Sequence, residues 1–236
     1  MKSRTFHVGA LIALLVAIGL SEHSVASGKA ERDSDRLVSF TYAFNRELRP
    51  TLEKKLLLTS ANHGRMIKIP SSPEIGESAV SVDCLAPDMR NGVCRVTVTR
   101  AKSSMENTMI EYWGKPDAIR KVEEIAVVRT DAEIPKRTAT AFRDCLRVMI
   151  PEPGDPLKLH PSTITDDDRI EFWLEEPNVA PRKGERAEKP GGRTKALIRI
   201  GDVLARYCEA PESERSRIAK QIEAEAARIL SHRNVK

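Results

Sequence analysis

Two short stretches of alternating apolar and polar residues most constrain how this chain can fold. The first, "ESAVSVDCL", ends near Cys84, and the second, "CRVTVTR", begins at Cys94, ten positions later. A period of two is typical of β-strands with one buried side. In an antiparallel hairpin with Cys84 opposite Cys94, Val82 faces Val96. In the same way, Val80 faces Val98. Every apolar residue then lies on one side, so the pattern predicts this register.

The spacing of these cysteines favours a disulfide over the other uses of paired thiols. Directly opposed residues have α-carbons about 4.5 to 5.5 Å apart, which is within disulfide range. Zinc sites commonly have cysteines two to four residues apart, and a thioredoxin-like redox pair needs Cys-x-x-Cys; neither pattern occurs in the chain. We therefore expect a bond between Cys84 and Cys94 that stabilises the fold by about 3 kcal/mol.

The remaining cysteines, Cys145 and Cys208, lie on the apolar sides of two predicted helices. The first helix is bounded by Pro135 and Pro151, and Pro211 ends the second. In an oxidising compartment the even number of cysteines predicts that this pair also forms a disulfide and ties the two helices together. The alternative is two buried free thiols that behave as small apolar residues.

The N-terminal segment has the pattern of a secretory signal peptide. Lys2 and Arg4 precede an uninterrupted apolar and glycine run over 8–20, and "SVA" places small residues before a cut after Ala26. The run has 13 residues, fewer than the roughly 20 that span a bilayer as a helix. We expect a cleaved signal over 1–26 and a periplasmic or secreted single domain over 27–236. The alternative is an uncleaved N-terminal anchor.

The other elements are predicted from periodicity and proline positions. The first is a helix over 34–48. The next segment is either a helix followed by a strand at 66–69 or a hairpin turning at 61–64. The later elements are an irregular or partly helical stretch over 103–121, a strand over 122–130, a helix over 135–151, a strand over 169–176 and two C-terminal helices, the second over 212–231. Short connections between strands favour an antiparallel sheet. The predicted fold class is α+β, a disulfide-stapled antiparallel sheet of about four to five strands, packed by helices on one face and followed by two C-terminal helices.

The segment over 177–195 has the composition of a flexible basic loop. It contains "PNVAPRKGERAEKPGGR", in which proline, glycine and charged residues predominate. Such a loop could contact an anionic envelope surface or an acidic protein; the alternative is a solvated loop with no partner. The candidate binding residues are Arg182, Lys183, Arg186, Lys189, Arg193 and Lys195.

A second candidate binding feature is the aromatic pair Tyr112 and Trp113 in "EYWGKP". The glycine and proline that follow predict a position near a loop tip, where aromatic side chains can anchor a protein interface. The alternative is that Trp113 covers the core.

Composition and motifs argue against several functions. A net charge of +5 and an aromatic content of 4% do not favour nucleic-acid binding. The chain has no Gly-x-Ser-x-Gly, Ser-x-x-Lys or His-Glu-x-x-His motif and no phosphate-binding glycine-rich loop. We expect no metal and no cofactor. Two weaker alternatives are a Cys145 nucleophile with His160 and a calcium ion at 166–168.

The leading functional hypothesis is an exported, non-catalytic bacterial protein that binds another envelope protein. Accessory, inhibitor and immunity-type roles all fit this description. Bacterial origin is inferred from the short signal and from the lack of an Asn-x-Ser/Thr acceptor. The alternative is an envelope hydrolase with dispersed acidic catalytic residues.

Overall fold

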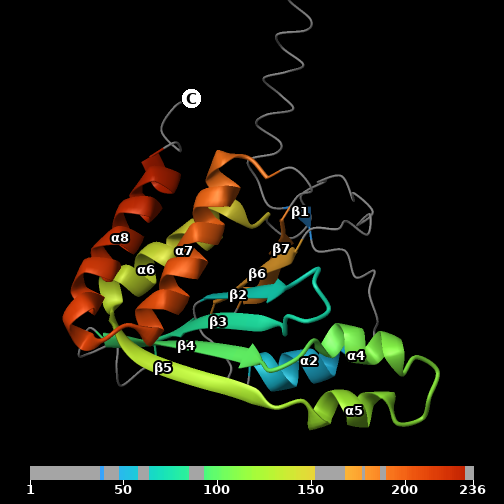
Figure 1. Cartoon of the computed structure of the whole chain (residues 1–236). Helices are drawn as coiled ribbons and strands as arrows, with labels where there is room; N and C mark the ends of the chain where they lie inside the picture. The colour runs from blue at the N-terminus through green and yellow to red at the C-terminus, as the bar shows by residue number, and fades with distance from the viewer. Residues whose placement is uncertain are drawn as a thin grey trace, which may run out of the picture.

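The fold is an α+β domain with helices on both faces of one antiparallel sheet (Figure 1). The computed structural model describes residues 38–39, 48–57, 64–84, 93–151, 168–176, 179–186 and 190–231. Its sheet has seven strands in the order β1-β7-β6-β2-β3-β4-β5, more than the expected four to five. The α+β class and the two C-terminal helices are confirmed.

The element bounds show which sequence segments form each layer. The strands are β1 (Val38–Ser39), β2 (Gly64–Ile69), β3 (Ser78–Asp83), β4 (Val93–Ala101), β5 (Val127–Pro135), β6 (Arg169–Glu176) and β7 (Val179–Glu185). The helices are α2 (Leu48–Leu57), α4 (Met105–Glu111), α5 (Ala118–Glu124), α6 (Lys136–Met149), α7 (Gly192–Glu209) and α8 (Glu212–Ser231).

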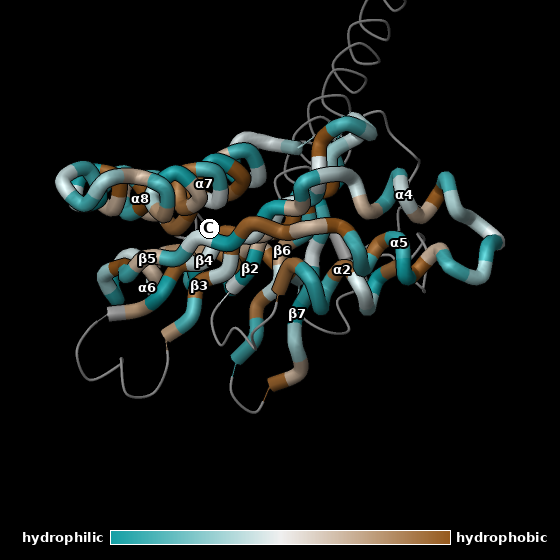
Figure 2. Tube along the Cα trace, turned by 60° about the horizontal axis from the view of Figure 1, so that its bottom comes forward, coloured by the Kyte–Doolittle hydropathy of each residue, from teal (hydrophilic) through white to brown (hydrophobic). Residues whose placement is uncertain are grey.

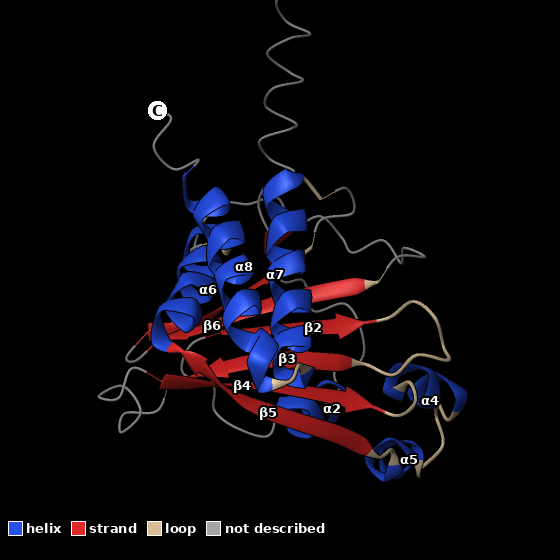
Figure 3. Cartoon of the chain, turned by 60° about the vertical axis from the view of Figure 1, so that its left-hand side comes forward, coloured by secondary structure: helices blue, strands red, loops and turns tan. Residues whose placement is uncertain are grey.

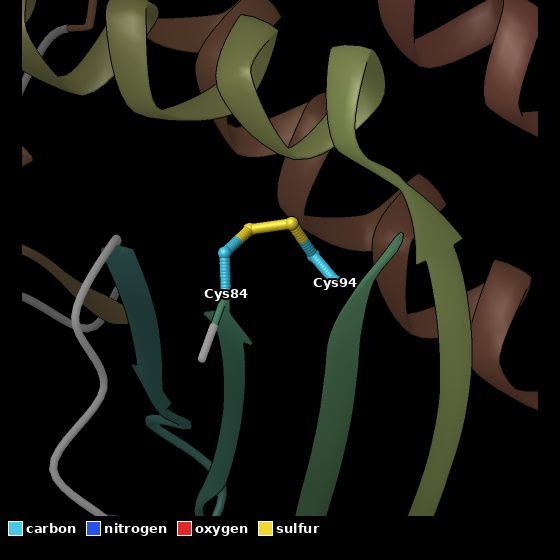
Figure 4. Close-up of a disulfide and its surroundings, with 2 residues drawn as sticks. All are labelled: Cys84 and Cys94. Carbon is cyan, nitrogen blue, oxygen red and sulfur yellow. A yellow bond between two sulfur atoms is a disulfide. The ribbon is translucent and has the colours of Figure 1, made fainter. Parts of the chain in front are cut away.

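The β3–β4 hairpin has the predicted register and disulfide. Val82 pairs with Val96, and Val80 pairs with Val98. A disulfide joins Cys84 to Cys94 at the end of the hairpin, with the two α-carbons 4.4 Å apart (Figure 4). The alternation of apolar residues was therefore enough to fix both the pairing and the cross-link.

Helices α6 and α7 pack on the side of the sheet that we call the apolar face, which carries these valines and Phe172, and α8 packs on α6 and α7 (Figure 3). Apolar and polar residues alternate along α7 and α8, as amphipathic surface helices require (Figure 2). The approach of α7 to the sheet is close at Gly201, where an added β-carbon would lie 2.2 Å from the Met66 sulfur. Glycine at this position leaves room for the Met66 side chain of β2 to pack directly against the helix backbone.

The opposite side of the sheet, which we call the mixed face, is covered by α2, and α4 and α5 pack against α2 at the end of the sheet. This corrects the expectation that helices cover only one face. Its apolar residues form a second, smaller core that includes Leu52, Met105 and Met109. The sheet also buries polar side chains here, among them Thr97 and Thr99. These two threonines are therefore shielded from solvent, although they belong to the polar side of the alternating strand β4.

The N-terminal helix prediction is wrong. In place of a helix over 34–48, Val38–Ser39 forms β1 and pairs with the end of β7, and helix α2 begins at Leu48. Pro50 does not end a helix; it lies in the first turn of α2, where its missing N–H is not required. The helix followed by a strand between 51 and 69 is confirmed, and the signal peptide lies outside the described residues.

The predicted flexible loop over 177–195 contains strand β7, so this prediction is also wrong. Its composition made the segment resemble a loop. Pro181 lies within the strand, but β1 pairs only with Gly184 and Glu185, farther along the strand. Proline is tolerated in a strand where its nitrogen has no required partner. Similarly, the strand predicted over 122–130 begins only at Val127, because the preceding residues belong to α5.

The second predicted disulfide is absent, and Cys145 and Cys208 are buried free thiols. The Cys145 thiol lies 3.7 Å from the carbonyl oxygen of Ala226 on α8. Cys208 instead faces the sheet, and its thiol donates to the carbonyl oxygen of Thr130, 3.1 Å away. The two side chains point at different neighbours, which a helical wheel for each separate helix cannot reveal.

We expect Cys84→Ser to lower the free energy of unfolding of the oxidised protein by about 3 kcal/mol, because the cross-link no longer restricts the unfolded chain. Thermal unfolding of the variant and the parent under full reduction is the control, and there the two should agree closely. Equal destabilisation in both conditions would show that the side chain acts through packing.

We also expect thiol counting to separate the two cysteine pairs. Alkylation of the unreduced, denatured protein should add two groups, at Cys145 and Cys208, while the folded protein should react slowly because both thiols are buried. Intact-mass spectrometry measures the number added. No added group would indicate a second disulfide, and four would contradict the first.

Candidate functional site

The α4–α5 segment, residues 102–126, projects from the end of the sheet between β4 and β5 (Figure 1). The start of α4 is fixed by two caps. The Ser104 hydroxyl accepts the N–H of Asn107 at 3.0 Å, and the buried carboxylate of Glu77 accepts the N–H groups of Met105 and Glu106, each at 2.8 Å. Caps of this kind satisfy amides that have no partner within the helix. Glu77, at the start of β3, therefore anchors α4 to the sheet.

The aromatic pair divides between the core and the surface. Tyr112 packs against the mixed-face core, and the Lys115 ammonium lies 4.5 Å from the centroid of its ring. Trp113 is 63% exposed, so it does not cover the core. Ile110, three residues earlier and therefore close to it at this helix end, is 54% exposed. Ile110 and Trp113 form an exposed pair, which we call the α4 patch.

The turn that follows the α4 patch is fixed by its backbone. Gly114 has a φ of 74°, in the left-handed region that glycine adopts without strain. The N–H of Lys115 donates to the carbonyl oxygen of Tyr112 at 3.0 Å. The two large apolar side chains are consequently displayed by the last turn of α4, which carries Ile110, and by the structured turn that follows it, which carries Trp113.

The predicted basic residues do not form one surface. Arg182 and Lys183 are consecutive in β7 and so point to opposite sides of the sheet. Arg182 lies 3.5 Å from Glu176, whereas Lys183 lies on the mixed face. Arg186 follows β7. Arg193 and Lys195 belong to the first turn of α7, and Lys189 lies outside the described residues.

The sequence reading missed a buried cluster of charged side chains around Trp173 on the mixed face. Three cations surround the indole ring, at 3.6 Å for the Lys183 nitrogen, 5.0 Å for Arg49 and 5.8 Å for Arg65, measured to the ring centroid. The periodicity of the residues over 169–176 predicts the strand but not the burial of its charged side chains. A side chain such as Glu171 is instead only 1% exposed, because α2 lies over it.

The strongest contact in this cluster joins α2 to the sheet. Arg49 on α2 makes two contacts with the Glu171 carboxylate on β6, at 2.8 and 2.6 Å. Its third nitrogen donates to Glu53, one turn later, at 2.6 Å. A two-pronged arginine–carboxylate pair fixes orientation as well as distance. The pair therefore determines how α2 lies on the mixed face.

A second carboxylate lies directly opposite Glu171. Glu185 on β7 faces Glu171 on the neighbouring strand β6 in the antiparallel ladder. Burial, and then the charge of Glu171, raise the pKa of Glu185 to about 7. Burial also lowers the pKa of Lys183. The cluster thus contains one carboxylate that binds a proton near neutral pH, Glu185, beside a second carboxylate, Glu171, that is paired with Arg49.

Two described residues belong to the weaker alternatives, Cys145 and Asp168, whereas His160 and positions 166–167 lie outside the described residues. Burial, followed by the charge of Asp144, raises the pKa of Cys145 to about 12, so its thiol is not activated. Asp168 accepts hydrogen bonds from the backbone and hydroxyl of Ser71, at 3.1 and 3.4 Å. Within the described residues no group of His, Cys, Asp or Glu side chains is arranged for a metal ion. No helix described here is both long and apolar enough to cross a bilayer.

Comparison with models of known protein families, with curated proteins and with solved structures finds no match. The geometry of the chain itself is therefore the basis for the functional proposal that follows.

We expect Glu185→Gln to change how stability depends on pH. The folded pKa of about 7 lies above the usual value of 4.5, so protonation of Glu185 stabilises the fold below about pH 4.5, and this contribution is lost as the pH rises toward 7. Glutamine stays neutral. The variant should therefore match the parent near pH 4 and exceed it above pH 7, by at most about 3 kcal/mol.

Denaturant unfolding at a series of pH values measures this difference. Glu74→Gln, at an exposed position of the β2–β3 connection, is the matched control and should follow the parent at every pH. A constant difference between Glu185→Gln and the parent would show that Glu185 does not titrate differently in the folded chain.

Proposed function

We propose that this chain is an exported, non-catalytic bacterial protein that works in the periplasm or outside the cell by binding another envelope protein through the α4 patch. The observation that carries the proposal is the exposure of Trp113 beside Ile110 on a fixed turn. Accessory, inhibitor and immunity-type roles remain the classes that fit.

Export is supported by the N-terminal sequence and by the disulfide. The basic start, the apolar run and the small residues before Ser27 match a secretory signal. The Cys84–Cys94 bond suits an oxidising compartment, because cytosolic proteins keep their thiols reduced.

Binding is supported by how the α4 patch is built. Tryptophan offers a large contact area with few rotatable bonds, and residues of this type often contribute most of an interface's affinity. The caps from Ser104 and Glu77 hold α4 in place before any partner arrives. Less conformational freedom is then lost on binding.

The alternative is an envelope hydrolase with dispersed acidic residues, and the observation that favours it is the Glu171–Glu185 pair. Two neighbouring carboxylates, of which Glu185 has a raised pKa, can serve as base and acid. Both oxygens of Glu171, however, already contact Arg49. The pair is better explained as part of the contact that positions α2.

The test is affinity capture from envelope extract with the exported chain, followed by mass spectrometry and by titration of the retained protein. We expect Trp113→Ala to weaken binding by about 30-fold, the effect of about 2 kcal/mol, without changing the melting temperature. Val179→Ala removes a comparably exposed apolar side chain from β7 and is the matched control.

Two results would overturn the proposal. One is a partner that binds Trp113→Ala and the parent equally well. The other is repeated capture of no protein together with turnover of a peptidoglycan or ester substrate that Glu171→Gln and Glu185→Gln both abolish. The second result would establish the hydrolase.

A further inference from the structure

Strand β5 forms one edge of the sheet and is long for an edge strand. It has nine residues and, among the described strands, pairs with β4 alone. Long exposed edges can accept another strand, and proteins normally shorten or cover them. Val128 is 49% exposed, and Arg129, Asp131 and Glu133 are exposed as well. No described helix covers these three charged side chains.

The direction of each backbone group along β5 follows from its ladder with β4. The N–H of Lys102 donates to the carbonyl oxygen of Ala126 at 2.9 Å, so the backbone carbonyl of Ala126 points toward β4. The ladder continues without a bulge to Pro135. Backbone groups alternate in direction along a strand, so those of Arg129, Asp131 and Glu133 point outward from the sheet edge.

One of these outward groups already has a partner within the chain. The Tyr207 hydroxyl on α7 donates to the carbonyl oxygen of Glu133 at 2.7 Å. This contact limits how far a second strand can pair along β5. The outward groups of Arg129 and Asp131 lie before that limit.

The charges of this stretch are complementary to a second copy of themselves. In an antiparallel pair of β5 strands related by a twofold axis at Thr130, Arg129 of each copy faces Asp131 of the other. Opposite charges at facing positions stabilise a sheet. On the other side of the strand, Val128 of each copy faces Ala132. An axis at Asp131 would instead place two aspartates face to face. It would also need the Glu133 carbonyl oxygen as a hydrogen-bond acceptor for the second strand, and this oxygen already accepts from Tyr207.

We propose that two copies of this chain associate through their β5 edges, with the twofold axis at Thr130, to form one continuous antiparallel sheet. The pairing contributes about four backbone hydrogen bonds and two Arg129–Asp131 ion pairs. Each copy also covers the exposed Val128 of the other. This surface is separate from the α4 patch, so the inference does not depend on the proposed function. A short ladder of this size gives a weak, concentration-dependent dimer.

The test is sedimentation equilibrium over a wide concentration range, with protein purified from cells that express the whole chain. We expect the parent to dimerise reversibly and Arg129→Glu to weaken the dimer by about tenfold or more, because two carboxylates then face each other. Asp131→Arg should have the same effect. Combining Arg129→Glu with Asp131→Arg should restore the dimer, because the ion pairs re-form with reversed sign.

The controls separate this surface from others and fix the register. Lys220→Glu makes the same charge change at an exposed position of α8 and should leave the dimer unchanged, as should Trp113→Ala. Rescue of Arg129→Glu by Glu133→Arg, and not by Asp131→Arg, would overturn the register. A parent that stays monomeric at every concentration, or a dimer indifferent to all the β5 variants, would overturn the proposal. Melting temperatures show that each variant is folded.

Discussion

The pairing of β3 with β4 is the constraint on which the rest of the structure depends. The hairpin is covalently closed at Cys84–Cys94, and its register decides which side chains of both strands face α6 and α7. β2 pairs with β3 and β5 with β4, so the alternation extends in both directions across the sheet. A slip of one residue would turn the valines toward the mixed face and the threonines toward the apolar core. The disulfide therefore contributes specificity as well as stability.

The two faces are held by different physical means. The apolar face binds its helices through hydrophobic burial, which has little directional preference. The mixed face is partly polar, and its helices are positioned by directional contacts: Arg49 with Glu171 orients α2, and Glu77 fixes the start of α4. Burial of charge is costly unless each group is paired, so these contacts are strongly specified. The orientation of the α4 patch rests on this second kind of contact.

The sequence predicted what local patterns determine and missed what depends on distant partners. The hairpin register followed from alternation around Cys84 and Cys94, and the C-terminal helices followed from their periodicity. The burial of Glu171 could not be predicted, because its partner Arg49 is 122 positions away. β7 was missed because the proline, glycine and charged residues over 177–193 have the composition of a loop.

The candidate sites were predictable to different degrees. The aromatic pair was identified, and the periodicity of α4 could have decided its orientation, since Met105 and Met109 mark the buried side and Ile110 lies off it. The basic residues were identified as a group only because a loop was expected there; a strand sends neighbours such as Arg182 and Lys183 to opposite faces. The prediction of a second disulfide was wrong for a similar reason. The apolar side of a helix does not reveal which other element packs against it.

The α4 patch and the β5 edge are linked through the same short segment. The N–H of Lys102 bonds to the carbonyl oxygen of Ala126, which closes the base of the α4–α5 segment where β5 begins. In the antiparallel dimer that we propose, this base lies at opposite ends of the two facing strands. The two α4 patches would then lie far apart and could not cover each other. Dimerisation would leave both patches open and could raise affinity for a partner that presents two sites, without any change in the patch itself.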